Sequence, residues 1–294
     1  MHTDRKHNSC SCVCVFIRGL FLVAGLCSAA DTVEHPFAGT THITRERMHI
    51  VQIDLRAPGI RFKLTPHNGR LETVRQTTLE FLEQERAQVA INAHFFLPFP
   101  SEQPEADLVG FAASDGKVYS RFEKPSQSYA LVRKAPALNI DRNNRVKITR
   151  RGWHPWTAVA GSAQIVTKGV KTIPVYKDAT HPRGQLTPGG PRNYSNSNSW
   201  YDVQTSRTAI GVTRDGKTLV IIAGERMAVG TVADLLIRDY GVWDALNLDG
   251  GGSTTLAMEN PETHTRAIVN TLPSNAKARS VGSSLAVFAQ PRIP

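Results

Sequence analysis

The chain has 294 residues, of which 40% are hydrophobic and 20% charged, with 22 glycines and 17 prolines. This apolar content is too high for a disordered chain, and the length allows one large domain or two small ones with an adequate core. The formal net charge of +10 favours anionic partners, such as phosphates or acidic glycans, although a basic surface that only keeps the protein soluble would have the same charge. No run of Lys and Arg with interleaved aromatic residues indicates nucleic acid.

Residues 1–30 are typical of a secretory signal peptide. Residues 5–7 (Arg-Lys-His) form a basic start, residues 20–26 (LFLVAGL) are the middle of an apolar stretch, and small residues follow as far as Ala30. The apolar stretch is short and is interrupted by Arg18, which disfavours a membrane span. We therefore expect a secreted or periplasmic protein with no stable membrane span after cleavage. An uncleaved anchor is the alternative.

All four cysteines lie inside this segment, at positions 10, 12, 14 and 27. The remaining chain, residues 31–294, has no thiol, which excludes disulfides, thiolate-bound zinc and a cysteine nucleophile there. No linker divides these residues, so we predict that they form a single domain.

The first half of that domain is predicted to contain several strands and one helix. Alternating apolar residues predict a β-hairpin formed by residues 48–55 and 60–64, and helical spacing predicts a helix at 71–87. A short buried strand follows at 88–92. Further short strands are predicted at 108–113, 117–120, 129–132, 145–149 and 158–166, with Asp115-Gly116 as the hairpin turn between the first two.

Residues 178–206 contain several prolines and glycines and a polar run without periodicity. A loop of this length inside a compact domain is usually functional or disordered. We interpret it as a mobile flap over a site, with a plain surface excursion as the alternative.

The C-terminal part has the clearest pattern. Residues 207–213 and 218–223 are predicted strands around a hairpin turn, and a helix is predicted at 231–240, with Thr231 and Asp234 as capping residues. Gly241 ends this helix. Strands follow at 244–249, 253–258 and 281–289. Many strands and two helices predict an α+β fold with mixed or antiparallel sheets.

The strongest motif is LNLDGGGSTT, at residues 246–255. An apolar strand leads into Asp249, where a catalytic carboxylate can project. Gly250, Gly251 and Gly252 then let the backbone approach a ligand closely, and their amides, with that of Ser253, can form an anion site. A tight turn stabilised by Asp249 would need only one glycine, so the run of three favours a functional site.

Two further motifs contain candidate binding residues. Arg207 begins an otherwise apolar strand, and its planar guanidinium suits a phosphate, although a salt bridge at the strand end would also explain it. Asn92 and His94 end the strand at 88–92. Asn92 can donate to and accept from sugar hydroxyls, whereas His94 is an acid/base, a ligand or a satisfied buried histidine.

No HExxH, P-loop, GxGxxG or GxSxG motif is present, and the histidines have no metal-ligand spacing. We predict no cofactor. A divalent metal stays an open alternative, because Asp and Asn side chains can hold a hard cation without a recognisable motif.

In this order the motifs resemble the phosphodiester glycosidase family, most strongly over residues 89–289. The family's Asn-Gly-Gly-(Phe/Tyr)-Phe pattern stands here as Asn-Ala-His-Phe-Phe at 92–96, so the glycines are replaced. Its Arg-Thr-Ala-Ile-Gly pattern falls on 207–211, its Asp-Gly-Gly-Gly-Ser pattern on 249–253, and its late Arg on Arg279. The resemblance implies an α+β fold and hydrolysis of a sugar 1-phosphodiester.

The residue chemistry is consistent with that reaction. The leaving phosphate monoester has a second pKa of about 6, so strong general-acid help is less necessary than for a sugar alkoxide. Asp249 would act as base or nucleophile, Arg207 and the glycine turn would stabilise the phosphate, and Arg279 would add to phosphate binding. Glu225 is the candidate second acid, with Asp107 as a weaker one.

We therefore expect a secreted hydrolase of glycosyl phosphodiesters in envelope or extracellular glycans, with an anionic glycan as substrate. Two alternatives remain open. A non-catalytic protein that binds anionic glycans, linked to exopolysaccharide metabolism, would use the same basic, glycine-rich pocket without turnover. An ordinary O-glycosidase would need two carboxylates roughly 5–10 Å apart across one pocket.

Overall fold

The structure is a computed structural model that describes residues 31–99, 101–122, 136–151, 153, 155–173, 186–187, 190–191, 201–272 and 277–292. Residues 31–294 form one compact unit. The predicted signal peptide, the predicted strand at 129–132 and most of the 178–206 loop lie outside the described residues.

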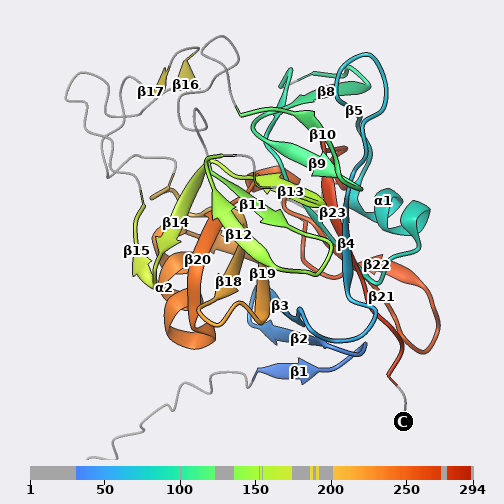
Figure 1. The fold of residues 1–294 in the computed structure, drawn as a ribbon, viewed down its shortest axis with the longest axis vertical. Helices are drawn as coiled ribbons and strands as arrows, with labels where there is room; N and C mark the ends of the chain where they lie inside the picture. The colour runs from blue at the N-terminus through green and yellow to red at the C-terminus, as the bar shows by residue number, and fades with distance from the viewer. Residues whose placement is uncertain are drawn as a thin grey trace, which may run out of the picture. The chain divides into compact units, whose positions relative to one another are not determined.

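The described residues form antiparallel sheets (Figure 1). The largest has eight strands, in the order β1 (Thr32–Glu34), β2 (Thr40–Arg45), β3 (Met48–Asp54), β19 (Thr218–Met227), β18 (Thr205–Thr213), β20 (Val242–Asn247), β14 (Ala163–Thr167) and β15 (Val170–Lys171). A second sheet has five strands, in the order β22 (Arg266–Ile268), β21 (Leu256–Glu259), β6 (Val89–Asn92), β23 (Ser284–Phe288) and β4 (Arg61–Leu64).

Three smaller sheets complete the described strands. One has five strands, in the order β10 (Lys117–Ser120), β9 (Ala112–Ser114), β13 (Thr157–Ala160), β11 (Ala137–Ile140) and β12 (Val146–Thr149). Another has three, in the order β5 (Thr73–Val74), β8 (Glu105–Leu108) and β7 (Phe96–Leu97). The last pairs β16 (Leu186–Thr187) with β17 (Gly190–Pro191). With two α-helices among the described residues, the strand-rich α+β prediction is confirmed.

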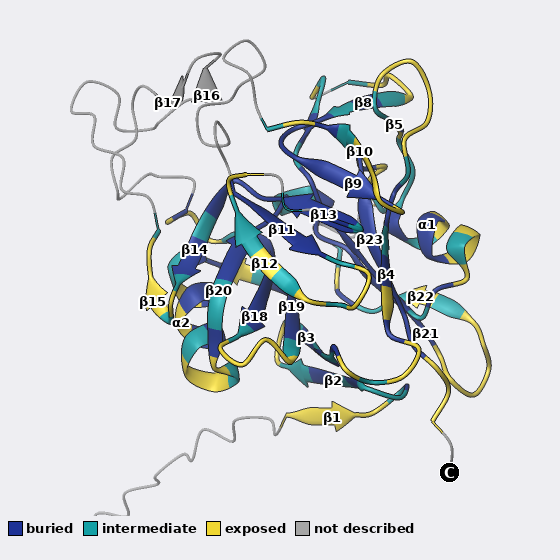
Figure 2. Cartoon of the chain, viewed as in Figure 1, coloured by how far each residue is buried: buried dark blue, intermediate teal, exposed yellow. Residues whose placement is uncertain are grey.

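The main core lies between the eight-stranded sheet and the sheet that contains β6 (Figure 2). Successive side chains of a strand point to opposite faces, so each strand divides its apolar residues between two cores. In β19, Ile221 belongs to the main core, whereas Val220 and Ile222 belong to the core on the other face, which α2 (Val229–Tyr240) covers. The helix α1 (Thr78–Glu85) covers the outer face of the β6 sheet.

The predicted hairpin at 48–55 and 60–64 is wrong in its pairing. Both segments are strands, but β3 pairs with β2 and β19, whereas β4 pairs with β23 in the other sheet. Ile53 and Phe62 nevertheless lie in the same core. The two strands therefore lie in different sheets and share no hydrogen-bonded edge. Their apolar faces meet in the core between the sheets.

Both predicted helices exist with different starts. The first begins at Thr78 and not near residue 71, because Thr77 and Glu80 form a capping box there; Leu71 and Val74 are exposed. The second begins at Val229, two residues before Thr231, and its N-cap Ala228 makes no side-chain cap. The predicted capping pair of Thr231 and Asp234 is therefore wrong. Gly241, with a φ of 60°, ends the helix as predicted.

Two predicted strands are each divided by a glycine. Residues 108–113 change direction at Gly110, whose φ of 101° suits glycine, so β8 and β9 belong to different sheets. Residues 158–166 divide at Gly161, where a Cβ would lie 2.3 Å from the carbonyl oxygen of Asn247. The chain passes there from β13 to β14, and the close approach requires glycine. The Asp115-Gly116 turn and the strands around residues 214–217 are as predicted.

Candidate functional site

The run of three glycines follows β20, and each glycine has its own structural reason. A Cβ on Gly250 would lie 2.8 Å from the carbonyl oxygen of Ser206, so this backbone lies directly against β18. Gly251 has a φ of 58°, which favours glycine. A Cβ on Gly252 would lie 2.5 Å from a guanidinium nitrogen of Arg279. The sequence therefore folds into a short 3-10 turn that brings Arg279 against bare backbone.

Only some of the amides in this turn remain available to a ligand. The Ser253 amide donates to the Gly250 carbonyl oxygen, and the Gly250 amide donates to the Asp249 carboxyl group. Within the described ranges, the amides of Gly251 and Gly252 have no acceptor. Two adjacent backbone donors beside a carboxyl group and a guanidinium are suited to an anion.

Asp249 supplies the carboxyl side chain of this turn, and its pKa is shifted. Its amide donates to the carbonyl oxygen of Ala93, which fixes it between the two large sheets, and the residue is only 9% exposed. Burial raises the pKa of Asp249 to about 7, although the Ser253 hydroxyl, Arg279 and the Gly250 amide each act to lower it. Asp249 can therefore exchange a proton near neutral pH, as a general acid or base requires.

Arg279 forms the exposed side of the same site. Its Nη1 donates to the Ser253 Oγ at 3.2 Å, and its guanidinium carbon lies 4.9 Å from the centre of the Phe99 ring. The guanidinium is thus held above the glycine turn while much of it faces solvent. A fixed cation beside a carboxyl group and amide donors can hold a phosphate.

Asn92 connects the strands below this turn. Its Nδ2 donates to the Asp249 carbonyl oxygen at 2.7 Å, and its Oδ1 accepts from the Thr208 hydroxyl at 2.9 Å and the Thr255 amide at 3.0 Å. The side chain is fully buried. These contacts position Asp249 and leave no exposed surface for a sugar hydroxyl.

His94 is also fully buried. Its Nδ1 lies 2.9 Å from the Ser283 Oγ, and its Nε2 accepts from the Ala160 amide at 2.9 Å, which assigns the ring proton to Nδ1. Burial lowers the pKa of His94 to about 4, against an opposing effect of the Phe111 carbonyl group. With these partners, His94 fits the hypothesis of a satisfied buried histidine, which was one of three that the sequence left open.

Arg207 lies behind the glycine turn, with 5% of its surface exposed. Its Nε donates to the Met227 carbonyl oxygen at 2.9 Å, and its Nη2 donates to the Val203 carbonyl oxygen. Burial lowers the pKa of Arg207 to about 10, while Tyr201 and Asp202 act to raise it. The guanidinium thus holds the entry to β18 against the end of β19.

Glu225 lies at the end of β19, where its amide donates to the Arg47 carbonyl oxygen. Burial and the neighbouring His42 lower the pKa of His49, and the charge of Glu225 acts in the opposite direction. The His42 Nε2 is 3.1 Å from the His49 Nδ1, and the His42 Nδ1 is 3.2 Å from a Glu34 carboxylate oxygen. Glu225 therefore belongs to a row of titratable groups along the sheet.

The structure brings together Asp249, the glycine turn, Ser253 and Arg279, with Asn92 beneath them. Phe99, Thr208 and Thr255 were missed by the sequence reading. Phe99 had a weak signal, since it is a large aromatic residue between two prolines. Thr208 and Thr255 lie inside the motifs at 207–211 and 246–255, but nothing in those motifs shows that either residue contacts Asn92.

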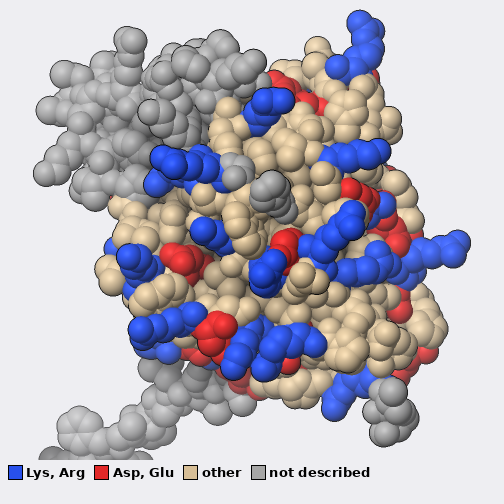
Figure 3. Space-filling view, viewed as in Figure 1, with Lys and Arg blue, Asp and Glu red and all other residues tan. Residues whose placement is uncertain are grey.

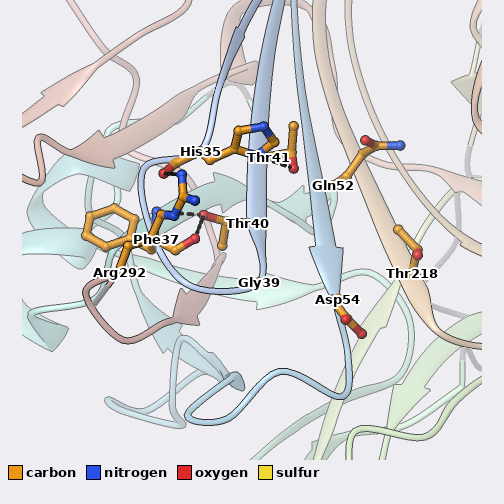
Figure 4. A pocket seen from close by; sticks show the side chains of 9 residues that line it. All are labelled: His35, Phe37, Gly39, Thr40, Thr41, Gln52, Asp54, Thr218 and Arg292. Carbon is orange, nitrogen blue, oxygen red and sulfur yellow. Dashed lines mark hydrogen bonds between the residues drawn. The ribbon is translucent and has the colours of Figure 1, made fainter. Parts of the chain in front are cut away.

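Elsewhere the described surface has a cavity of about 330 Å³. Figure 4 shows side chains of β2 and β3 around it, including Thr41, Gln52 and Asp54, with Arg292 beside them. None of the predicted site residues lines this cavity. On the face drawn in Figure 3, Lys and Arg are interspersed with Asp and Glu and do not form a single basic patch.

Among the described residues, no group of three or more His, Cys, Asp or Glu side chains is arranged to hold a metal ion. The described helices also include none with the length and apolar content needed to cross a membrane.

Solved structures share this architecture. The catalytic domain of zebrafish N-acetylglucosamine-1-phosphodiester alpha-N-acetylglucosaminidase, auto-inhibited by its pro-peptide, matches with a TM-score of 0.57 and 18% identity, over 89% of this chain and 81% of that one. A Burkholderia pseudomallei protein described as exported matches with a TM-score of 0.53 and 15% identity, over 86% of this chain and 76% of that one. A Synechocystis protein of unassigned function has a TM-score of 0.53 at 16% identity, over 88% of this chain and 61% of that one.

At these identities the structural matches establish the fold. The sequence profile of the phosphodiester glycosidase family matches residues 85–288, which include Asn92, Asp249 and Arg279. The chain therefore belongs to the phosphodiester glycosidase family. A search of curated proteins found no match.

Proposed function

We propose that the protein hydrolyses a sugar 1-phosphodiester at the turn formed by Asp249, the three glycines and Arg279. The observation that carries the proposal is a buried carboxyl group with a raised pKa beside an exposed guanidinium and two amide donors. Family membership supports the same reaction class.

The reaction needs few groups. Water adds to the anomeric carbon, the bond from that carbon to the phosphate oxygen breaks, and the oxygen leaves with a phosphate monoester. This leaving group has a second pKa of about 6, so it departs without strong protonation. Asp249 acts as the base that takes a proton from water, or as the nucleophile that water later displaces. Arg279 and the amides of Gly251 and Gly252 stabilise the charge that develops on the phosphate.

The other predicted residues support this turn. Asn92 positions Asp249 through its carbonyl oxygen, and Arg207 holds the strand against which Gly250 packs. His94, which follows β6, bonds to Ala160 in β13 and to Ser283, just before β23. Glu225 is proposed as a second carboxylate, and its charge raises the pKa of His49.

An assay of sugar 1-phosphodiesters with a methyl leaving group tests the proposal. Hexose and N-acetylhexosamine 1-phosphates are suitable sugars, and release of reducing sugar is the measurement. We expect Asp249→Asn to lower kcat/KM by at least about 100-fold, because it removes the proton-accepting group. Asp244→Asn, on the strand β20 that leads into Asp249, is the matched control and should retain activity.

Arg279→Met tests the phosphate contact, with Arg292→Met as the control for loss of an exposed arginine. We expect Arg279→Met to lower kcat/KM by about 50-fold or more, because the anion loses a charge-assisted contact. Unchanged turnover in folded Asp249→Asn would overturn the proposal. Tight binding of the diesters without turnover by the wild type would instead indicate a glycan-binding protein.

We further propose that the protein acts outside the cytoplasm, on envelope or extracellular glycans. The basic and apolar patterns of residues 1–30 and the lack of cysteine after them support this location. N-terminal sequencing of protein recovered from the medium or periplasm tests it. The expected start is residue 31, and a chain retained in the cytoplasm with residues 1–30 intact would contradict it.

A further inference from the structure

A cavity of about 430 Å³ opens beside Arg279. Its walls come from the segment between β7 and β8 and from the segment before β23, and they include Phe99, Ser101, Glu102, Gln103, Arg279 and Ser280. Arg279 thus lines this cavity and also contacts Ser253 in the glycine turn. The cavity and the site at the glycine turn therefore share the Arg279 guanidinium.

The contacts define an order along the surface. The Asp249 carboxyl group bonds to the Ser253 hydroxyl, the Ser253 Oγ accepts from Arg279, and the Arg279 guanidinium lies over the Phe99 ring. If Asp249 acts at the anomeric carbon and Arg279 holds the phosphate, the group on the other side of the phosphate lies next to Phe99. That group is the one that leaves with the phosphate.

The wall that carries Phe99 is held in place by Arg75. Its guanidinium donates to the carbonyl oxygens of Pro98, Ser101 and Glu105, at 2.6, 2.9 and 3.1 Å. It also lies 5.0 Å from the centre of the Phe96 ring, whose edge contacts Phe99 at a centroid distance of 5.7 Å. Arg75 is thus occupied by backbone carbonyls, and the wall is preformed before a ligand arrives.

The chemistry of the cavity favours a neutral group rich in hydroxyls. Phe99 is 45% exposed as a residue, and its ring offers an apolar face to the CH groups of a sugar or polyol. Gln103, Ser101 and Ser280 can donate to and accept from hydroxyl groups. The Glu102 carboxylate accepts from hydroxyls but repels a second phosphate, which disfavours a nucleotide leaving group. A long hydrocarbon chain would leave these polar groups unpaired.

We propose that this cavity binds the leaving-group side of the diester, and that it selects a polyol or sugar phosphate there. This subsite proposal rests on the proposed function, because the order of the subsites assumes that Asp249 is the reacting carboxylate.

Binding of the leaving group alone tests the subsite without any turnover. Calorimetry would compare methyl phosphate, hexyl phosphate and sorbitol 6-phosphate on the full chain. We expect sorbitol 6-phosphate to bind about tenfold more tightly than the other two, because only it fills the hydroxyl-binding positions. Equal affinity of all three, or tightest binding of hexyl phosphate, overturns the proposal.

Variants then assign the preference to this cavity. Phe99→Ala and, separately, Gln103→Ala should bring the affinity for sorbitol 6-phosphate close to that for methyl phosphate. Both residues are exposed, and Gln103 serves as the second variant if the first disturbs folding. Gln52→Ala, in the cavity of Figure 4, is the matched control and should retain the preference. A preference that survives in both variants overturns the subsite.

The same variants separate this proposal from the proposed function. If the wild type hydrolyses diesters, Phe99→Ala should raise KM about tenfold for a sorbitol leaving group and less than about twofold for a methyl one. Equal effects on both substrates overturn the subsite but not the hydrolase. No hydrolysis of any diester, with the binding preference intact, overturns the hydrolase but not the recognition of the phosphate ester.

Discussion

The structure has two adjacent polar regions, one with Asn92 and His94 and the other with Asp249 and Arg279. Hydrogen bonds to the Asp249 backbone join them. In the first region the key polar atoms are buried and have protein partners, and both side chains are fully buried. In the second, a carboxyl group with a raised pKa lies under an exposed guanidinium and two amides that have no acceptor among the described residues. Satisfied groups hold strands together, whereas unsatisfied donors beside a charge can bind a ligand.

The two regions also differ in the sign of their pKa shifts. Burial raises the pKa of Asp249 to about 7 and lowers the pKa of His94 to about 4. Burial favours the neutral form in both cases. The consequence is that the two groups have opposite effects on stability as the pH changes, so titration can distinguish them.

The largest effect on stability is expected in the first region. Asn92→Ala should lower the free energy of unfolding by about 3 kcal/mol, because it leaves the Thr255 amide and the Asp249 carbonyl oxygen without their buried partner. Urea denaturation measures the change. Arg279→Met is the contrasting variant, with a change within about 0.5 kcal/mol, since Arg279 is exposed. A larger loss from Arg279→Met than from Asn92→Ala would reverse the comparison.

The next effect concerns Asp249. An Asp with a raised folded pKa destabilises the fold once it ionises, so stability is lost as the pH rises above the unfolded pKa of 3.8 and through about 7. Asp249→Asn has no such charge. Its stability relative to the wild type should therefore be about 2.5 kcal/mol greater at pH 7.5 than at pH 5. Thermal or urea unfolding at both pH values gives the difference, and a difference that does not vary with pH would contradict a raised pKa.

His94 should show the opposite dependence, with a smaller size. A His with a lowered folded pKa contributes stability that is present above the unfolded pKa of 6.5 and is lost as the pH falls toward 4. At pH 5 this loss is about 2 kcal/mol in the wild type. His94→Gln lacks the titrating ring, so its deficit relative to the wild type should shrink between pH 7.5 and pH 5. A constant deficit over that range would mean that His94 does not titrate abnormally.

The smallest effect concerns Glu225 and the histidines on the first strands. The charge of Glu225 raises the pKa of His49. Glu225→Gln should therefore lower the pKa of His49, and the ring carbon shift of His49 in NMR measures it. Glu262→Gln, an exposed carboxylate elsewhere, is the control. No change in His49 would show that Glu225 does not act on this row.

The glycine turn was the part of the site most accessible from the sequence. Three consecutive glycines exceed what a turn requires. A side chain on the first or third would collide with Ser206 or Arg279, and the second has a positive φ that favours glycine. Strand alternation predicted β18 and β19, and Gly241 predicted the end of the second helix. These signals are local, so they can be read from neighbouring residues.

The remaining features depend on partners far along the chain. Residues 48–55 and 60–64 show the same alternation whether they pair with each other or face each other across a core, so their pairing required the positions of β19 and β23. The backbone carbonyls of Val203 and Met227 that Arg207 contacts carry no side-chain signal in the sequence. Phe99 becomes informative only when Arg279 is seen to lie over its ring.

The most direct test of the account is the titration of the Asp249 carboxyl carbon by NMR in the wild type and in Arg279→Met. The account predicts a pKa near 7 in the wild type, because burial outweighs the hydroxyl, guanidinium and amide that favour the charged form. It predicts a higher pKa in Arg279→Met, because the nearby positive charge is removed. An Asp249 pKa near that of an exposed aspartate, unchanged by the loss of Arg279, would contradict the site on which the proposed chemistry depends.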